Sequence, residues 1–484
     1  MAWFSDHWLA GVLLVVYTGV LLYHARIGAQ RSHNMTEYYV GGRNLGGLVV
    51  GVSFFATFAS TNSYIGHAGK GYEYGLPWMV MAVFIVVFTW LSWTLVAPRL
   101  RRFTSHWDAL TLPDYLAARF GADTRALRTF AALVILLSSL LYLVAIFKGA
   151  GNLFERFLTI PYEQAVGLTL VIVVLYTSIG GFVSVVRTDV VQGILMILGS
   201  TTIFFFVFRA AGGVDAFPDL AAAPETSELF TLNAGIPFIV LLGIALSGSL
   251  KLLVDPRQVS RFYALKDEQS VKVGIWVAVG GIALIQLCLF PVGLLARALL
   301  DGVTDTDLVI PTLINDPTIF PLWVADFLVV AMVAAAMSSM DSVLLVAASV
   351  LYKDVVETVH PTAHPLTWTR IGVVGFSVLA AIIALDPPGG IVEITIFSGS
   401  LYAVCFFPAI LFGLHWSRGT AAGTLSAMIA GVTVLLAWMF FGPRDAVHEV
   451  FPALATSCAV YALVAWRSPP ALDALPTGSA PAGP

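Results

Sequence analysis

Long apolar blocks separated by short polar segments dominate this sequence and constrain its fold more than any other feature. Two examples are residues 271–300 and 420–442, and each exceeds the roughly 18 mostly apolar residues that can cross a bilayer as a helix. Charged residues make up only 11% of the 484 residues, against about 25% in soluble domains. Because lipid cannot hydrogen-bond an exposed backbone, these blocks must be helical. The sequence therefore predicts an all-α polytopic membrane protein embedded in a lipid bilayer.

The apolar blocks and their interruptions predict about 13 spanning helices in one transmembrane domain, residues 1–467. A Pro-, Ala- and Gly-rich tail, 468–484, is expected to be disordered. Residues 9–23 are expected to be a retained helix, because the preceding residues lack the charge and cleavage site of a signal peptide. The net charge of −4 gives no reason to expect a nucleic-acid partner, and no obligate protein partner is inferred. The predicted spans are 8–25, 47–70, 77–98, 124–154, 162–184, 189–210, 234–254, 271–298, 321–354, 369–386, 391–415, 420–441 and 449–466.

Basic residues fall in alternate loops, and this asymmetry predicts the orientation in a cell membrane. With the N-terminus outside and the C-terminus in the cytoplasm, the opposite loops carry mainly acids: Asp215, Asp219, Glu225, Glu228, Asp301, Asp305 and Asp307. The expected cytoplasmic basic residues are Arg26, Arg31, Arg43, Arg99, Arg101, Arg102, Arg119, Arg125, Arg128, Arg257, Arg261, Lys266, Lys272, Lys353, Arg370 and Arg418.

Small polar residues interrupt the second predicted helix near its middle. The run at 53–66 contains Ser53, Thr57, Ser60, Thr61, Asn62 and Ser63. Such side chains compete with the backbone for hydrogen bonds, so local unwinding there is easy and would free carbonyls to coordinate a cation. The alternative is a helix pair packed tightly through Ser and Thr. A weaker interruption is expected at 247–249 in helix seven; two broken helices are typical of inverted-repeat transporters, although small residues also serve ordinary helix packing.

The ninth predicted helix carries a hydroxyl-rich face and a carboxylate. Ser338 and Ser342 lie four residues apart on one face, with Ser339 and Asp341 beside them. A carboxylate within a membrane helix normally faces a cavity or a partner, and hydroxyl oxygens suit Na⁺. The alternative is that Asp341 simply pairs with Arg187.

Two further charged residues have open interpretations. Asp189 either contributes to a site or caps the helix that follows it. Lys148 is a lone ammonium in an apolar helix. It either extends to the outer interface or faces the cavity and meets a carboxylate, from Glu393 or from the substrate.

Several segments resemble the sodium/solute symporter family, in order and spacing, over roughly residues 36–440. The branch whose patterns are most similar is that of the pantothenate permeases, on 56–60, 160–163, 307–313 and 425–429. The segments that carry the family resemblance are YYVGGR at 38–43, the run 53–66, GKGY at 69–72, WDALTLPDY at 107–115, YTSIGG at 176–181 with 188–189, AAAMSSMDS at 334–342 and GLHW at 413–416.

The resemblance implies a leucine-transporter-like core of two inverted five-helix repeats, 46–210 and 234–416, with one helix before and two after. It implies Na⁺-coupled symport of a small organic solute into the cell by alternating access. The alternative is a channel or a sensor built on the same fold. An enzyme is not expected, because it would need a catalytic constellation, and His67, which lies well inside a predicted span, has no metal-ligand partner.

The resemblance also implies site residues. The Na⁺ ligands would be the carbonyls of Ala56, Ala59 and Ala335 and the hydroxyls of Ser338 and Ser339, and Na⁺ is the only cofactor expected. A second cation site, for Na⁺ or a proton, would use Asp189, Asp341 and Ser342. The substrate would be bound by Ser60, Thr61, Asn62, Ser63, Lys148, Ser247, Ser249, Phe397, Ser398 and Tyr402.

Residues that differ from those of known members of the family restrict the class of substrate. The family's sugar carriers have an acidic residue and a glutamine where this chain has Asn62 and Ser63, so a sugar is disfavoured. Lys148 replaces an apolar residue expected in the pantothenate branch and favours an anionic substrate, a carboxylate or an amino acid.

Overall fold

The computed structural model describes residues 7–31, 34–121, 124–360 and 364–468. Within these ranges the chain is helical, and the only strand-like pairing is an isolated bridge between Leu45 and Leu265. The predicted disordered tail lies outside the described residues, apart from Ser468. The first-half helices are α2 (Trp8–Arg31), α3 (Met35–Val40), α4 (Gly47–Phe58), η2 (Asn62–Gly66), α5 (His67–Tyr74), α6 (Met79–Leu91), η4 (Ser92–Val96), α7 (Ala97–His106), α8 (Leu112–Phe120), α9 (Arg125–Leu158) and α10 (Tyr162–Ala210).

The second half begins with a loop that contains the short helix α11 (Ala216–Ala222). Its remaining main helices are α12 (Phe238–Val254), α13 (Pro256–Tyr263), α14 (Glu268–Leu295), η8 (Thr306–Leu308), α15 (Val309–Ile314), α16 (Leu322–Val350), η9 (Leu351–Val356), α17 (Glu357–Val359), α18 (Pro365–Ala384), α19 (Ile391–Phe407), η10 (Pro408–Phe412), α20 (Gly413–His415), α21 (Ala421–Phe441) and α22 (Val450–Arg467).

Eleven helices of the described residues are long and apolar enough to cross a membrane, or twelve when the bent pair α4 and η2–α5 counts as one span. The predicted number of 13 is therefore not confirmed. The difference lies in α10, whose 49 residues count once although a straight helix of that length would measure about 74 Å against a hydrocarbon core of about 30 Å. Gly181 interrupts α10 with non-helical angles, φ 64° and ψ −174°, close to the predicted boundary between two spans.

The predicted interruption of helix two is confirmed. Ala59 ends α4 in an extended conformation, φ −69° and ψ 113°, and the chain resumes as the π-helical turn η2. The two halves of the span are bent by 56° relative to each other. We call residues Ala59 to Ser63 the break.

The interruption expected at 247–249 is wrong in position, because α12 runs through these residues without a break. The chain instead leaves the helix at Asp255, φ −63° and ψ 124°. The cause is Pro256, which disfavours the helical conformation of the residue before it and takes the first position of α13. The Asp255 side chain then accepts a hydrogen bond from Arg257 N and caps α13.

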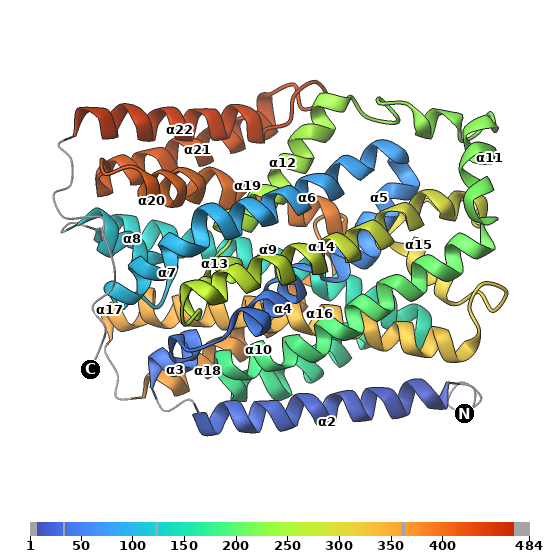
Figure 1. Cartoon of the computed structure of the whole chain (residues 1–484), viewed down its shortest axis with the longest axis horizontal. Helices are drawn as coiled ribbons and strands as arrows, with labels where there is room; N and C mark the ends of the chain where they lie inside the picture. Colours follow the sequence, from blue (N-terminus) through green and yellow to red (C-terminus); the bar gives the residue numbers. More distant parts are fainter. Residues whose placement is uncertain (1–6, 32–33, 122–123, 361–363, 469–484) are drawn as a thin grey trace.

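The helices are arranged so that the break lies near the centre of the bundle. In Figure 1, α2 lies along one edge and α22 along the opposite edge, with α4, α9 and α16 between them. Most of α16 is buried, although Leu322 and Trp323 at its start are exposed, and the helix packs against α10, α9 and α4. We call the end of the bundle where α2 begins the N-terminal end, and the opposite end, with α7, α8 and α17, the basic end (Figure 1).

Candidate sodium and solute sites

The end of α4 provides backbone carbonyls that the helix itself does not use. Ala59 N donates to Phe55 O at 2.9 Å, and Ser63 N donates to Ser60 O at 2.9 Å instead of to Ala59 O. Among the described residues, no backbone N–H from outside α4 donates to the carbonyl of Ala56 or Ala59. Carbonyls released by a broken membrane helix are the groups that coordinate Na⁺ in transporters of this kind.

Two serines of α16 lie against this end of α4. Ser339 Oγ donates to Thr57 O at 3.1 Å, and Ser338 Oγ donates to Asp189 Oδ1 at 2.7 Å. Each hydroxyl thus directs its single hydrogen to a protein acceptor, which leaves its oxygen lone pairs available to a cation. The groups present therefore fit Na⁺, which the break and α16 would hold between them.

Asp189 lies in a fully buried ion pair with Arg261. Arg261 Nη2 is 3.3 Å from Asp189 Oδ2, and neither side chain has any solvent exposure. Asp189 also accepts hydrogen bonds from Ser53 Oγ at 2.6 Å and from Ser338. The expectation that Arg261 lies in a cytoplasmic loop is wrong, because α13 packs into the bundle against α4 and buries this side chain.

The Arg261 guanidinium lies where a second cation was expected. It donates to Ser342 Oγ at 2.5 Å and to Ser53 Oγ at 3.2 Å, in addition to its contact with Asp189. In this structure Arg261 therefore supplies a positive charge beside Asp189, and the second cation site stays a prediction.

Asp341 is held apart from this cluster. Thr177 Oγ1 of α10 donates to Asp341 Oδ1 at 2.6 Å, while Asp341 Oδ2 has no hydrogen-bond partner among the described residues. The alternative pairing of Asp341 with Arg187 does not occur in the described part of the chain. The three residues expected to form a second cation site therefore have different partners. Asp189 and Ser342 contact Arg261, whereas Asp341 accepts a hydrogen bond from Thr177.

The polar residues expected to bind substrate at the break are buried and only partly hydrogen-bonded. Ser60 Oγ accepts from Tyr142 OH of α9 at 3.1 Å, and Asn62 Nδ2 lies 3.3 Å from His67 Nε2. Thr61 Oγ1, Asn62 Oδ1 and His67 Nδ1 have no partner among the described residues. Ser63 is buried in the same turn. Because buried polar atoms are rarely left unsatisfied, the break has the polar character of a binding site.

Three of the other expected substrate contacts join helices to one another. Ser247 lies 2.6 Å from Ser400 Oγ, so it links α12 to α19. Ser398 Oγ donates to Ser138 O at 2.9 Å, and the Tyr402 hydroxyl contacts α9 at Ser139 Oγ and Ile135 O. These hydroxyls join α9, α12 and α19 to one another in this structure.

The remaining two expected contacts on these helices differ from each other. Ser249 Oγ is buried with no hydrogen-bond partner among the described residues. Phe397 lines a groove on the side of the N-terminal end, with Trp78 and Ile244 among its neighbours.

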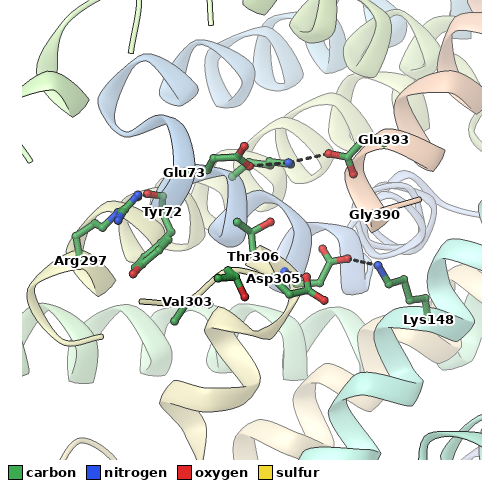
Figure 2. A pocket seen from close by; sticks show the side chains of 12 residues that line it. Tyr72, Glu73, Lys148, Arg297, Val303, Asp305, Thr306, Gly390 and Glu393 are labelled. Carbon is green, nitrogen blue, oxygen red and sulfur yellow. Dashed lines mark hydrogen bonds and ion pairs between the residues drawn. The ribbon is translucent and has the colours of Figure 1, made fainter. Parts of the chain in front are cut away.

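Lys148 forms an ion pair with a protein carboxylate. Its Nζ is 2.7 Å from Asp307 Oδ2 and 3.2 Å from Gly389 O. The expected partner Glu393 pairs with Lys70 at 2.7 Å. Lys148 and Glu393 both line a cavity of about 480 Å³ at the N-terminal end, and Figure 2 shows them on the same side of the view, each in a different ion pair. Because its charge is already balanced, Lys148 gives no support for an anionic substrate.

A different lysine, not predicted as a site residue, has no such partner. Lys251 is the fourteenth of the 26 residues in the span Phe238–Tyr263, is buried, and makes no hydrogen bond or ion pair within the described part of the chain. Its Nζ lies 5.3 Å from the ring centroid of Phe58 and 5.5 Å from that of Tyr142. Each such contact is worth about 0.5–2 kcal/mol, while an ammonium at mid-membrane costs roughly 2.5–3.5 kcal/mol on insertion scales.

The sequence did contain a signal for this residue. Lys251 is the single charged residue of the segment 238–254, and the same feature makes Lys148 a candidate site residue. Both satisfy the rule that an ionisable residue within a span marks a functional site, and only the structure separates the paired lysine from the unpaired one.

The interrupted helices and the buried polar centre between them define a secondary transporter. The chain belongs to the sodium:solute symporter family, whose model matches residues 38–431. It is 28% identical over 446 residues to a sodium/pantothenate symporter of Haemophilus influenzae, covering 89% of each chain. It is also 28% identical to a sodium/proline symporter of Staphylococcus aureus, covering 92% of this chain and 89% of that one.

Solved structures share the fold. A Na⁺-coupled sialic acid symporter superposes with a TM-score of 0.82 at 19% identity, covering 95% of this chain and 98% of that one. The nucleobase-cation-symport-1 transporter Mhp1 gives a TM-score of 0.59 at 14% identity, covering 89% and 95%. The fold is thus the leucine-transporter-like fold.

These findings decide the class of protein. The chain is a multi-pass membrane protein and a Na⁺-coupled secondary active transporter, and it is not an enzyme. The family and the relatives are symporters, which does not support the alternative of a channel or a sensor.

Proposed function

We propose that this transporter carries a small organic carboxylate or amino acid into the cell together with Na⁺, by alternating access. The observation that carries the proposal is the meeting of α4 and α16, where the carbonyls of Ala56 and Ala59 lack donors from beyond the helix. Ser338 and Ser339 face the same region with their oxygen lone pairs free. The Ala335 carbonyl completes the proposed ligand set. A site without a carboxylate binds Na⁺ modestly, which suits an ion that must be released on the other side.

The substrate class is supported by the relatives. Pantothenate and proline are the solutes named for two sodium symporters similar in sequence to this chain, and sialic acid is the solute of the Na⁺-coupled symporter that superposes with a TM-score of 0.82. Each of the three solutes carries one carboxylate. We propose that the solute binds at the break, beside Ser60, Thr61, Asn62 and Ser63.

Two sets of ion pairs support alternating access. At the N-terminal end, Lys148 pairs with Asp307 and Lys70 with Glu393. On the other side of the break, Arg261 pairs with Asp189. Opening towards either side would break one set while the other stays closed. Because Arg261 already balances Asp189, the proposal uses a single Na⁺ and places no second cation between Asp189 and Asp341.

The proposed orientation places the basic end in the cytoplasm, with the N-terminus outside the cell and the C-terminus inside. The excess of arginine and lysine at that end supports it. The two broken spans, α4–α5 and α12–α13, would be the corresponding first helices of the inverted repeats 46–210 and 234–416.

The test is Na⁺-driven uptake into proteoliposomes, with labelled L-proline, D-pantothenate and N-acetylneuraminate as probes. We expect wild-type protein to accumulate at least one probe when Na⁺ is outside, and the double variant Ser338→Ala/Ser339→Ala to accumulate none. The matched control is Ser349→Ala, which removes a buried hydroxyl of α16 that bonds only to Leu345 O. Full Na⁺-driven uptake by a folded double variant would contradict the proposed Na⁺ site.

A further inference from the structure

The charge of Lys251 is not balanced by its surroundings. Asp255 follows one helical turn later, where its N–H donates to Lys251 O at 2.7 Å, but Arg257 engages both carboxylate oxygens of Asp255, with Nε at 3.0 Å from Oδ1 and 2.9 Å from Oδ2. Asp255 and Arg257 therefore cancel each other. One positive charge remains, buried at the middle of a spanning segment.

This ammonium lies beside the break. It is flanked by the ring of Phe58, the last residue of α4, and by the ring of Tyr142, whose hydroxyl donates to Ser60. Its aliphatic stem passes over Gly399 of α19, where an added Cβ would lie 3.5 Å from Lys251 Cδ. The glycine leaves room for the stem, so that the charged end reaches the unwound residues.

A second, independent observation concerns the break itself. Thr61 Oγ1, Asn62 Oδ1 and His67 Nδ1 are buried and have no hydrogen-bond partner among the described residues. These atoms belong to the break and to the first turn of α5. A ligand with one negative group and further polar groups would satisfy both them and Lys251.

We infer that Lys251 binds the carboxylate of the transported solute and selects for a single negative charge. The inference rests on the proposed function, because it names the group that recognises the solute at the break. One unbalanced positive charge matches one carboxylate, since a dianion would bring a new unpaired charge into the site. A cationic solute would be repelled. Lys148, whose charge Asp307 already balances, has no part in this selection.

The experiment compares acids with their neutral analogues in proteoliposomes. D-pantothenate is paired with panthenol, in which an alcohol replaces the carboxylate, and L-proline and N-acetylneuraminate are measured beside them. The variants are Lys251→Gln, Lys251→Arg and the control Lys272→Gln, which changes an exposed lysine of α14. Na⁺ binding is followed separately, as the increase in melting temperature that Na⁺ causes without solute.

We expect Lys251→Gln to raise the KM for a transported acid roughly tenfold or more, because the variant loses a charge-assisted hydrogen bond. The variant should also prefer the acid over its neutral analogue less strongly than wild type does. Stabilisation by Na⁺ should persist, Lys251→Arg should retain most acid uptake, and Lys272→Gln should behave as wild type.

Three outcomes would overturn the inference. The first is a Lys251→Gln protein with an unchanged KM for the acid. The second is wild-type protein that takes up panthenol as well as pantothenate. The third is Na⁺-driven uptake only of solutes that lack a carboxylate. That result would support Na⁺ symport but contradict recognition of a carboxylate by Lys251. Absence of Na⁺-driven uptake for every probe would count against the proposed function as well.

Discussion

Replacing Asp189 with asparagine should expose how the protein tolerates a buried arginine. Among the described residues, Asp189 is the only charged group that pairs with Arg261. The other acceptors of its guanidinium are neutral: Ser53 Oγ, Ser260 Oγ, Ser342 Oγ and Arg257 O. Asp189→Asn therefore leaves a full positive charge without a counter-charge in a fully buried place. The expected loss in free energy of unfolding is about 3–5 kcal/mol, the usual cost of breaking a buried pair on one side.

Replacing Arg261 in place of Asp189 should reduce the free energy of unfolding by a smaller amount. In Arg261→Met, the Asp189 carboxyl keeps the hydroxyl donors of Ser53 and Ser338 at 2.6 and 2.7 Å and can also take up a proton. We expect the free energy of unfolding to fall by about 1–3 kcal/mol, which is the cost of leaving buried polar atoms without a partner. The double variant Asp189→Asn/Arg261→Met should be more stable than Asp189→Asn alone, because it removes the unpaired charge.

The assay is unfolding in mixed micelles, followed by the fluorescence of the twelve tryptophans. The double-mutant cycle isolates the interaction between the two side chains. Arg102→Met is the control, because its pair with Glu268 is half-exposed and should contribute no more than about 1 kcal/mol. If the two single losses simply add in the double variant, Asp189 and Arg261 are not energetically coupled and the reasoning fails.

Three further predictions follow from other parts of the molecule. Gly293→Ala should destabilise the protein in the same unfolding assay, because its Cβ would lie 1.9 Å from Ala68 O, whereas the control Gly280→Ala meets nothing within 4 Å. Lys148→Asp and Asp307→Lys should each impair uptake, and the exchanged pair should recover part of it; failure of the exchange to recover any uptake would argue against a role for this ion pair. Because Arg261 supplies the second positive charge, the Hill coefficient for Na⁺ in uptake should be about one, and a value near two would restore a second Na⁺ site.

The break in the second helix could be predicted from sequence because its cause is local. Residues 57–63 contain Thr57, Ser60, Thr61, Asn62 and Ser63 in one apolar span, and such side chains weaken a helix wherever it lies. The structure places the break at Ala59. In the second half, the serines of 247–249 predict an interruption that does not occur, whereas Pro256, the stronger local signal, ends α12 at Asp255.

The partners of the buried charges could not be predicted in the same way. Asp189 and Arg261 are 72 residues apart, and a single sequence does not show which helices pack together. The positive-inside rule assigns Arg261 to a cytoplasmic loop, because the rule considers only the positions of basic residues along the chain. It takes no account of the packing of α13 against α4. For the same reason, the sequence does not show that Lys148 pairs with Asp307 or that Lys251 lacks a carboxylate partner among the described residues.

The most direct test of Na⁺-coupled symport is the simultaneous entry of radioactive Na⁺ and labelled solute into the same proteoliposomes. We predict that adding the transported solute stimulates Na⁺ entry in proportion, with about one Na⁺ for each solute molecule, and that Ser338→Ala/Ser339→Ala abolishes both fluxes together. Solute entry at an undiminished rate without accompanying Na⁺ would contradict the coupling that the break, Ser338 and Ser339 are proposed to provide.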